Sequence, residues 1–256
     1  MSRVSSRRSP FRHVLGYVGA IALLLIGWEL LALAIDLPAL PPPTAAIPAF
    51  VQLFGDILPQ IWVSAWRVVA SLALGSVLAV PLGLAIGRSP RADSVAAPLI
   101  FLSYPVPKVV FLPVFMILLG IGSLSKIALI TLIVFFQILV TARDAARSIP
   151  PASVLSARSL GAETGQVFRH VVFPASLPDI FTALRIGSGT AVAVLFLAEA
   201  TAGTSGLGYY IVDAWGRVDY EAMFAGVLAM ALLGVVLYEV LELLEGRLCR
   251  WTRAGQ

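Results

Sequence analysis

Residues that could carry chemistry are few in this sequence. Its only lysines are Lys108 and Lys126, and neither follows the glycine pattern of a P-loop, so the chain has no ATP site of that kind. The two histidines, His13 and His170, belong to no zinc motif, and a single Cys249 cannot form an internal disulfide. We therefore expect no catalytic residue, no metal ligands and no cofactor.

Among the ionisable residues in or beside long apolar runs, the candidates for a functional role are Glu29, Lys108 and Glu199. Charged side chains are rare inside a bilayer and usually face a bundle interior or an aqueous path. Lys108 could reach the surface or offer a positive charge to an anion, and Glu29 is expected near the outer interface. Glu199 precedes a glycine-rich stretch, 203–208, and we expect it to fix that turn, or a gate, by hydrogen bonding. The stretch looks like a phosphate-cradling loop, but a tight turn explains it better.

The composition places these residues in a membrane. Hydrophobic residues make up 59% of the 256 residues and charged residues only 12%, with a mean hydropathy of +0.94. Soluble domains typically have about 45–50% apolar and about 25% charged residues. These values exclude a soluble enzyme, a disordered chain and a disulfide scaffold.

Six apolar runs reach or approach the length of about 20 residues that a helix needs to cross a bilayer. They cover 14–35, 64–87, 95–119, 126–142, 182–203 and 222–244. The third run contains several prolines, so we expect it to be kinked, with part of it along the interface. The sequence therefore predicts an all-α integral membrane protein with six transmembrane helices.

Arginines gather in alternate loops. They occur in 1–13, 88–91, 143–169 and 245–256, whereas 36–62 has no lysine or arginine and 205–221 has only Arg217. Because positively charged loops stay in the cytoplasm, both termini and the loop 150–178 are predicted to be cytoplasmic. The predicted segments are a basic tail (1–13), a first helix (14–35), an external loop (36–63), a core of five helices containing the loop 150–178 (64–244), and a second tail (245–256).

The N-terminus leaves an alternative open. A basic start, an apolar run and small residues at 32–34 are typical of a cleavable secretory signal. The run from 14 to 31 is longer than the usual signal core of about 7–15 residues, which favours an uncleaved helix. Cleavage would leave five spans and an external N-terminus.

The loop 150–178 contains two short helical patterns joined near Gly161. Val154, Ala157 and Leu160 share one face of the first pattern. Gly161 is predicted to end that helix in a left-handed turn, a conformation that glycine adopts without a steric penalty from Cβ.

The second pattern has apolar positions at Val167, Phe168, 171 and 172, and Pro174 and Pro178 are predicted to stop it before the fifth span. A compact helix–turn–helix with apolar side chains suggests a plug for a groove on another protein. An interfacial helix pair lying on membrane lipid, supported by basic residues, explains the pattern equally well.

The loop resembles the EAA loop of ATP-binding cassette (ABC) importer permeases. That pattern is Glu-Ala-Ala, three residues, Gly, then nine residues and Ile-x-Leu-Pro. Gly161 and the Val-Val-Phe-Pro at 171–174 stand at the matching separations, and Ala157 matches the second alanine. Ser156 replaces the first alanine, and Leu155 stands where the family has its glutamate.

The resemblance extends over most of the chain and is specific for permeases of the nitrate/sulfonate/taurine/bicarbonate importers. The matching stretches are Leu-Pro-Pro-Pro at 40–43, Trp-Arg at 66–67, Tyr-Pro-Val-Pro-Lys at 104–108, Ala-Arg-Ser-Leu-Gly-Ala at 157–162, and Glu199 followed by Gly-Thr-Ser-Gly-Leu-Gly-Tyr at 203–209.

This resemblance implies a type I ABC importer permease fold in a bacterial inner membrane. Two permease chains, expected to be identical, would form the pathway, two cytoplasmic P-loop ATPase subunits would dimerise on ATP, and an external binding protein would deliver a small anionic or organic solute such as a sulfonate, nitrate or taurine. No nucleic acid is involved. The coupling loop would contact the ATPase through Ala157, Arg158, Leu160, Gly161, Phe168 and Pro174.

Small residues recur every four positions in two spans, at 71–87 in the second and at 183–191 in the fifth. Such spacing lets helix backbones approach closely in lipid. We expect static packing in the second span and a pathway or dimer contact in the fifth. The predicted pathway or gate residues are Lys108, Gly187, Thr190 and Glu199.

Two other function classes remain open on the sequence. One is a proton-coupled secondary transporter that uses Glu29 and Glu199, although no second copy of the proline-rich third span is present, as paired repeats would require. The other is a scaffold that only anchors a cytoplasmic partner. The coupling-loop pattern favours the importer over both.

Overall fold

The computed structural model describes residues 10–103 and 105–252, and its described elements are all helical. Arg3, Arg7 and Arg8 of the predicted basic tail, Tyr104 of the proline-rich motif, and Arg253 lie outside the described residues. The elements are α1 (Pro10–Ile35), α2 (Pro43–Gln52), α3 (Phe54–Arg88), α4 (Pro90–Ser103), η1 (Lys108–Phe111), α5 (Leu112–Leu119), α6 (Ser123–Ser148), α7 (Pro151–Ser159), α8 (Thr164–Val167), η2 (Phe168–Val172), α9 (Phe173–Ala202), α10 (Leu207–Gly216), α11 (Tyr220–Leu248) and η3 (Arg250–Thr252).

Four of the described helices are long and apolar enough to cross a membrane: α3, α6, α11 and the continuous helix Thr164–Ala202. α4 and the η1–α5 segment together give a fifth span if they count as one, and α1 contributes a shorter apolar stretch, Gly19–Ile35. The all-helical membrane architecture is thus confirmed, whereas the count of six spans stays a prediction.

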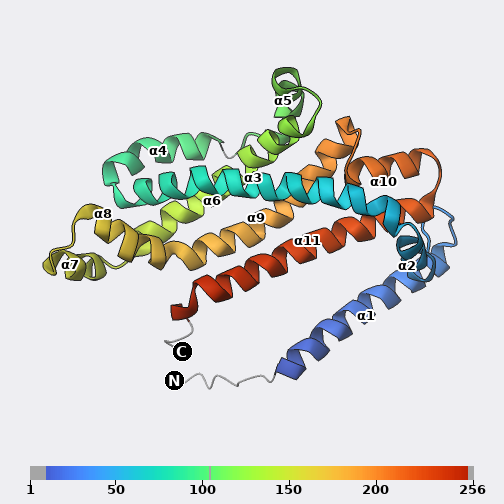
Figure 1. The fold of residues 1–256 in the computed structure, drawn as a ribbon, viewed down its shortest axis with the longest axis horizontal. Helices are drawn as coiled ribbons and strands as arrows, with labels where there is room; N and C mark the ends of the chain where they lie inside the picture. The colour runs from blue at the N-terminus through green and yellow to red at the C-terminus, as the bar shows by residue number, and fades with distance from the viewer. Residues whose placement is uncertain (1–9, 104, 253–256) are drawn as a thin grey trace.

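The proline-rich third run is broken, as its sequence indicates. α4 and the η1–α5 segment meet at an angle of 84°, and α5 projects from the bundle (Figure 1). Pro105 and Pro107 lie in the break. Proline has no N–H for a helical hydrogen bond and disfavours helical conformation in the residue before it. Two prolines in three residues therefore end α4.

Pro174 and Pro178 do not stop the second helix of the loop, so that prediction is wrong. The helix runs on through both into α9. Phe168–Val172 form a π-helical turn, which changes the hydrogen-bond spacing just before Pro174. Pro174 then occupies the first turn of α9, where its missing N–H is not needed. Pro178 lies inside the helix, which membrane helices tolerate when neighbouring helices pack around them.

α3, α6 and α9 lie side by side and α11 runs along α9 (Figure 1). One apolar core fills the middle of the bundle between α3, α6 and α9. A second core lies where the loop α7–η2 meets the ends of α3 and α6. A third, at the opposite end, joins α3, α10 and α11.

The small-residue stripe of the second span forms the contact between α3 and α6. A Cβ at Gly83 would lie 2.6 Å from the backbone oxygen of Leu139 and 2.8 Å from the Cβ of Ala142. A Cβ at Gly75 would lie 2.9 Å from a methyl carbon of Val134. Because glycine has no side chain, these two positions of α3 allow its backbone to contact α6 directly. This is the close packing that the small-residue spacing predicts.

The segment 36–63, predicted as an external loop, contains α2 and the first ten residues of α3. Glu29 on α1 accepts a hydrogen bond of 2.9 Å from the hydroxyl of Thr44 and one of 3.3 Å from its backbone N–H. Thr44 lies in the first turn of α2, so this carboxylate satisfies a free donor and complements the positive end of the helix. Trp28 stacks on Phe224 of α11, with 5.4 Å between ring centroids.

The arginines of the described loops gather at one end of the bundle. They lie at the end of α3, the start of α4, the end of α6, in the loop α7–η2 and at the end of α11: Arg88, Arg91, Arg143, Arg147, Arg158, Arg169, Arg247 and Arg250. Asp93 on α4 pairs with Arg143 and Arg147, which ties α4 to α6 there. At the opposite end, Arg217 follows α10. The fold thus separates basic from arginine-poor loops.

Replacing Gly83 by alanine should destabilise the protein. The added methyl group would press on the α6 backbone, and overpacking of this kind typically costs about 1–3 kcal/mol. Thermal unfolding in detergent would measure the loss. Gly55→Ala on the same helix is the matched control, because a Cβ there meets no atom within 4 Å. Equal melting temperatures for the two variants would contradict the close contact between α3 and α6.

Candidate functional site

The turn at the tip of the loop 150–178 depends on one glycine. α7 ends at Ser159, and Gly161 has φ of +85°, the left-handed conformation that its sequence position predicts. The N–H of Gly161 donates to the oxygen of Arg158 (2.9 Å), and that of Ala162 donates to the oxygen of Ala157 (3.1 Å). These bonds satisfy the free carbonyl groups at the end of α7, as a glycine helix terminator does.

The next helix begins with a capping box that the sequence analysis missed. The backbone N–H of Glu163 donates to the side-chain oxygen of Gln166 (2.8 Å), and the Glu163 side chain accepts from the backbone of the third helical residue. An acidic residue followed three positions later by glutamine is a local signal for this arrangement. Together, the glycine and the box fix the angle between α7 and the continuous helix.

The loop is packed onto the end of the bundle. Val154, Val167 and Val172 are buried in one core with Leu84 of α3 and Ala146 of α6. A displacement of the loop must therefore move these helix ends or break this core.

The exposed part of the loop differs from the predicted face. Val154 packs inward and Ala157 packs against the same core, but Leu160 is 89% exposed, so its predicted place on that face is wrong. The reason is that α7 ends at Ser159, and Leu160 therefore leaves the helical face. Leu155, Arg158, Leu160 and Gly161 are all exposed and form what we call the loop tip. Phe168 and Pro174 are half-buried at its base.

A second site lies at the opposite end of α9, around the carboxylate of Glu199. The Glu199 side chain is completely buried and pairs with Arg67 of α3, with 2.6 Å between Nη1 and Oε1. The hydroxyl of Ser64 lies 3.0 Å from Oε1 and 2.9 Å from Oε2. The backbone N–H of Gly208 donates to Oε2 at 2.9 Å. Both oxygens of this buried carboxylate therefore have hydrogen-bond donors, one of them charged.

Arg67 is 3% exposed and reaches three elements besides its own. Its Nε donates to the hydroxyl of Ser123 at the start of α6 (3.1 Å). Its two Nη atoms donate to the backbone oxygen (2.8 Å) and the hydroxyl (3.0 Å) of Ser205. One guanidinium therefore joins α3 to α6, to α9 and to the glycine-rich turn, which its planar array of donors permits.

The glycine-rich turn 203–208 cradles this carboxylate rather than a phosphate. Gly206 has φ of +104°, and a Cβ on it would collide with the Glu199 carboxylate. A Cβ on Gly208 would lie 2.7 Å from the Cβ of Glu199. The N–H of Gly206 donates to the side-chain oxygen of Gln60 (2.6 Å), and that of Leu207 donates to the hydroxyl of Ser64 (2.8 Å). The turn therefore packs closely against α9 and is hydrogen-bonded to α3.

Lys126 completes the group that we call the Glu199 cluster: Gln60, Ser64, Arg67, Ser123, Lys126, Glu199 and the turn 203–208. Lys126 is 1% exposed, and its Nζ lies 3.1 Å from the oxygen of Ala202, 3.1 Å from that of Ile121 and 3.3 Å from that of Gly122. A cation on the final carbonyl of α9 complements the negative end of that helix. The sequence predicted only Glu199 as a site residue in this cluster. Arg67 and Lys126 also lie in apolar runs, and two buried basic residues near a buried acid could have indicated the other members.

The other predicted pathway residues do not join this cluster. Lys108 donates to the backbone oxygen of Ser103 (2.8 Å) and lies 4.9 Å from the centroid of the Phe136 ring. Gly187 is buried, with Gln137 and Leu72 at ordinary contact distance. Thr190 is half-buried, and its hydroxyl lies 3.4 Å from the carbonyl of Ile186 in its own helix.

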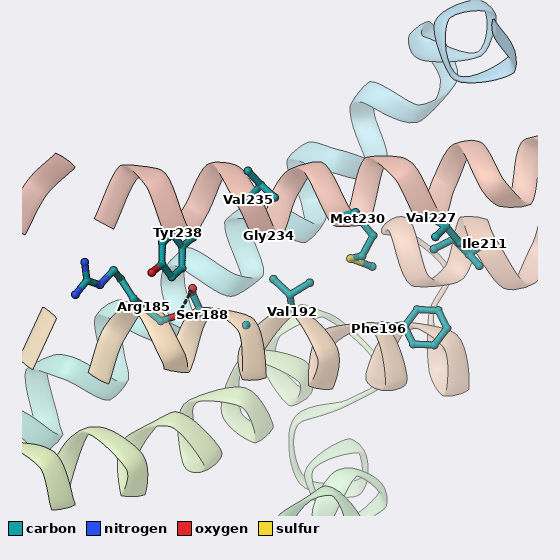
Figure 2. A pocket seen from close by; sticks show the side chains of 12 residues that line it. Arg185, Ser188, Val192, Phe196, Ile211, Val227, Met230, Gly234, Val235 and Tyr238 are labelled. Carbon is teal, nitrogen blue, oxygen red and sulfur yellow. Dashed lines mark hydrogen bonds between the residues drawn. The ribbon is translucent and has the colours of Figure 1, made fainter. Parts of the chain in front are cut away.

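A cavity of about 560 Å³ lies between α9 and α11 (Figure 2). Its walls are mostly apolar, with Val192, Phe196 and Met230 facing the space, while Arg185 and Tyr238 lie toward one end. The guanidinium of Arg185 pairs with Glu245 of α11 at 3.0 Å. Across the described part of the chain, no group of three or more His, Cys, Asp or Glu residues could hold a metal ion.

These features define a class. The protein has several apolar helices, basic loops at one end and a helix–turn–helix packed at that same end. This arrangement is typical of a multi-pass transport permease. The family described as "Binding-protein-dependent transport system inner membrane component" matches residues 71–250. The chain belongs to this family and is a permease subunit of an ABC importer.

Individual relatives agree. The chain is 33% identical over 263 residues to the taurine transport system permease protein TauC of Escherichia coli (strain K12), which covers 97% of this chain and 96% of TauC. It is 27% identical over 252 residues to the putative aliphatic sulfonates transport permease protein SsuC of Bacillus subtilis (strain 168), covering 96% and 91% of the two chains.

The fold is shared with a solved transporter. A chain of the MetNI methionine ABC transporter, in an inward-facing conformation, matches with a TM-score of 0.65 at 18% identity over 77% of this chain and 98% of that chain. The family match and the relatives TauC and SsuC confirm the predicted importer permease, and the alternative of a proton-coupled secondary transporter is not favoured.

Removing the Ser64 hydroxyl should destabilise the Glu199 cluster. Ser64→Ala leaves the Leu207 N–H without its acceptor and takes a donor from the carboxylate, and a buried group left unpaired costs about 1–3 kcal/mol. Thermal unfolding in detergent would measure this. Ser76→Ala is the matched control, because Ser76 lies on the same helix and its hydroxyl donates to the carbonyl of Leu72 one turn back. A Ser64 variant as stable as the control would contradict the cluster geometry.

Proposed function

We propose that the loop α7–η2 is the coupling element through which a separate cytoplasmic P-loop ATPase drives this permease. The observation that carries the proposal is its placement: an exposed tip on a base buried against α3 and α6, continuous with α9. The chain itself is the non-catalytic transport subunit, and ATP hydrolysis takes place on the partner.

A push on the loop tip has a direct mechanical route into the membrane. Val167 and Val172 lie in the core that also holds Leu84 and Ala146, at the ends of α3 and α6. The loop's second helix is the start of the 39-residue helix Thr164–Ala202. Movement of the tip therefore displaces three spans together. ATP then acts by favouring the ATPase conformation that prefers one loop position over another.

The contact on the ATPase has a defined chemistry. Leu155 is 60% exposed and Leu160 is 89% exposed, and Arg158, which lies between them in the sequence, is exposed as well. Leu155 occupies the position of the family's glutamate, so an apolar contact replaces a polar one there. The matching ATPase groove would offer apolar side chains for the two leucines and an acceptor for the arginine.

The solute is proposed to be a small organic anion of the sulfonate kind, with taurine and nitrate in the same range. The support comes from TauC and SsuC, whose names give taurine and aliphatic sulfonates. An external binding protein would deliver the solute and hold most of the recognition. Lys108, Gly187, Thr190 and Glu199 remain the proposed pathway or gate residues.

The proposed complex has two copies of this permease and two ATPase subunits in a bacterial inner membrane. The gathering of loop arginines at one end of the bundle supports an orientation with that end, the coupling loop and both termini in the cytoplasm. The Glu199 cluster then lies toward the outer surface. A second permease chain and membrane lipid would cover the outward-facing leucines of α1.

Replacing Gly161 by valine should abolish ATP-driven uptake and leave membrane insertion intact. Valine at φ of +85° is strained by about 1–2 kcal/mol or more, which reshapes the loop tip. Gly165→Val is the matched control. Gly165 lies in the same loop, its φ is not positive, and a Cβ added there would meet no atom within 4 Å.

Two measurements check this prediction: taurine uptake by cells, and mass spectrometry of the proteins that co-purify with the tagged chain in mild detergent. We expect an ATPase at stoichiometric level with the wild type and the Gly165 variant, and its loss with Gly161→Val. Normal uptake by the Gly161 variant would refute the coupling assignment.

A further inference from the structure

The surroundings of the Glu199 carboxylate have the composition of an anion-binding site. A guanidinium, a hydroxyl and a backbone N–H converge on its two oxygens, contributed by Arg67, Ser64 and Gly208. Gly208 lies in the first turn of α10, a helix of ten residues whose positive end therefore points at the carboxylate. Such donor sets bind carboxylates, phosphates and sulfonates in proteins.

The anion in this site belongs to the chain itself. Glu199 is completely buried, and the turn closes over it because Gly206 has no Cβ. Among the described residues, Glu199 supplies the one carboxylate in contact with Arg67, while the neighbouring cation Lys126 contacts backbone oxygens. If the carboxylate moved away, a buried guanidinium would lose its counterion. Because a partly separated ion pair would leave the guanidinium buried without a counterion, the bundle favours two discrete states, one with the pair closed and one with it fully open.

This site lies at one end of the helix whose other end is the coupling loop. α9 has 30 residues from Phe173 to Ala202, so about 45 Å of unbroken helix separates the loop from the cluster. The cluster ties α9 to α3, to α6 and to α10. In Figure 1, α7 and α8 lie at one end of the bundle and α10 at the other.

We propose that the Glu199 carboxylate is a built-in anion that latches the outer ends of α3, α9 and α10 together in the resting state, and that the ATP-driven movement of the coupling loop works against this latch. Arg67 and Ser64 are its positioning residues. The inference rests on the importer function proposed above and adds its regulation: the latch restrains ATP hydrolysis until the outer end is released.

Glu199→Gln tests the latch, because it keeps the side-chain shape and removes the charge. The permease would be purified with its ATPase and reconstituted in liposomes, and MgATP hydrolysis would be measured without binding protein or solute. We expect basal hydrolysis to rise about tenfold, because unpairing a buried ion pair shifts a two-state equilibrium by at least that factor. The control is Glu245→Gln on α11. It removes a carboxylate that pairs with Arg185, which lies on α9 as Glu199 does, and it should leave the rate unchanged.

Glu199→Ala tests whether the site accepts an anion. This variant leaves a space lined by the guanidinium, the hydroxyl and the N–H, and added sodium formate should fill it and return hydrolysis toward the wild-type rate in a saturable manner. Formamide, the neutral analogue, should have no effect. The Glu245→Ala variant should not respond to formate.

The outcomes are distinct. A Glu199→Gln complex that assembles and hydrolyses ATP at the wild-type basal rate would overturn the latch, as would a lower yield of complex with unchanged hydrolysis per complex, because that is the signature of a purely structural role. If the alanine variant fails to assemble, the glutamine variant decides alone. A wild-type chain that purifies without any ATPase would instead refute the proposed function itself, and the latch with it.

Discussion

A buried ion pair between Arg67 and Glu199 is the interaction on which one end of this protein depends. Two charges inside an apolar bundle cost free energy unless they are paired and their remaining hydrogen-bonding groups are satisfied. Here Ser64, Ser123, Ser205 and the backbone of the turn after α9 supply those partners. The requirement to satisfy one carboxylate therefore fixes the positions of four helices and explains why the turn is rich in glycine.

The rest of the bundle is held by close backbone contact. Lipid tails are as apolar as the helices, so the hydrophobic effect does not drive helices together inside a bilayer. Van der Waals packing must stabilise the bundle instead. Gly75 and Gly83 let α3 lie directly against the backbone of α6, and α9 closes the same core. The result is a stiff unit of three spans with a polar cluster at one end and the packed loop at the other.

Stiffness matters for the proposed coupling, because free energy from a separate ATPase would reach the permease through contact at the loop. The π-helical turn at Phe168–Val172 allows the helix to pass Pro174 and Pro178 without a break. One continuous helix thus runs from Thr164, three residues after the loop tip, to Glu199. Had the prolines ended the helix, as their types alone suggest, the two sites would be joined by a flexible link and a push at one end would be lost before the other.

The sequence by itself determined the class of protein, the approximate positions of the apolar spans, the break in the third run, the left-handed glycine at 161 and the family. These follow from composition, period and local steric limits, which neighbouring residues decide. Only the tertiary structure decided that the helix passes its prolines, that Leu160 faces outward, that Arg67 and Ser64 meet Glu199, and that Lys126 meets the last carbonyl of α9. Ser64 and Arg67 lie more than 130 positions from Glu199 along the chain, and contacts of that kind depend on how whole helices pack rather than on any local pattern.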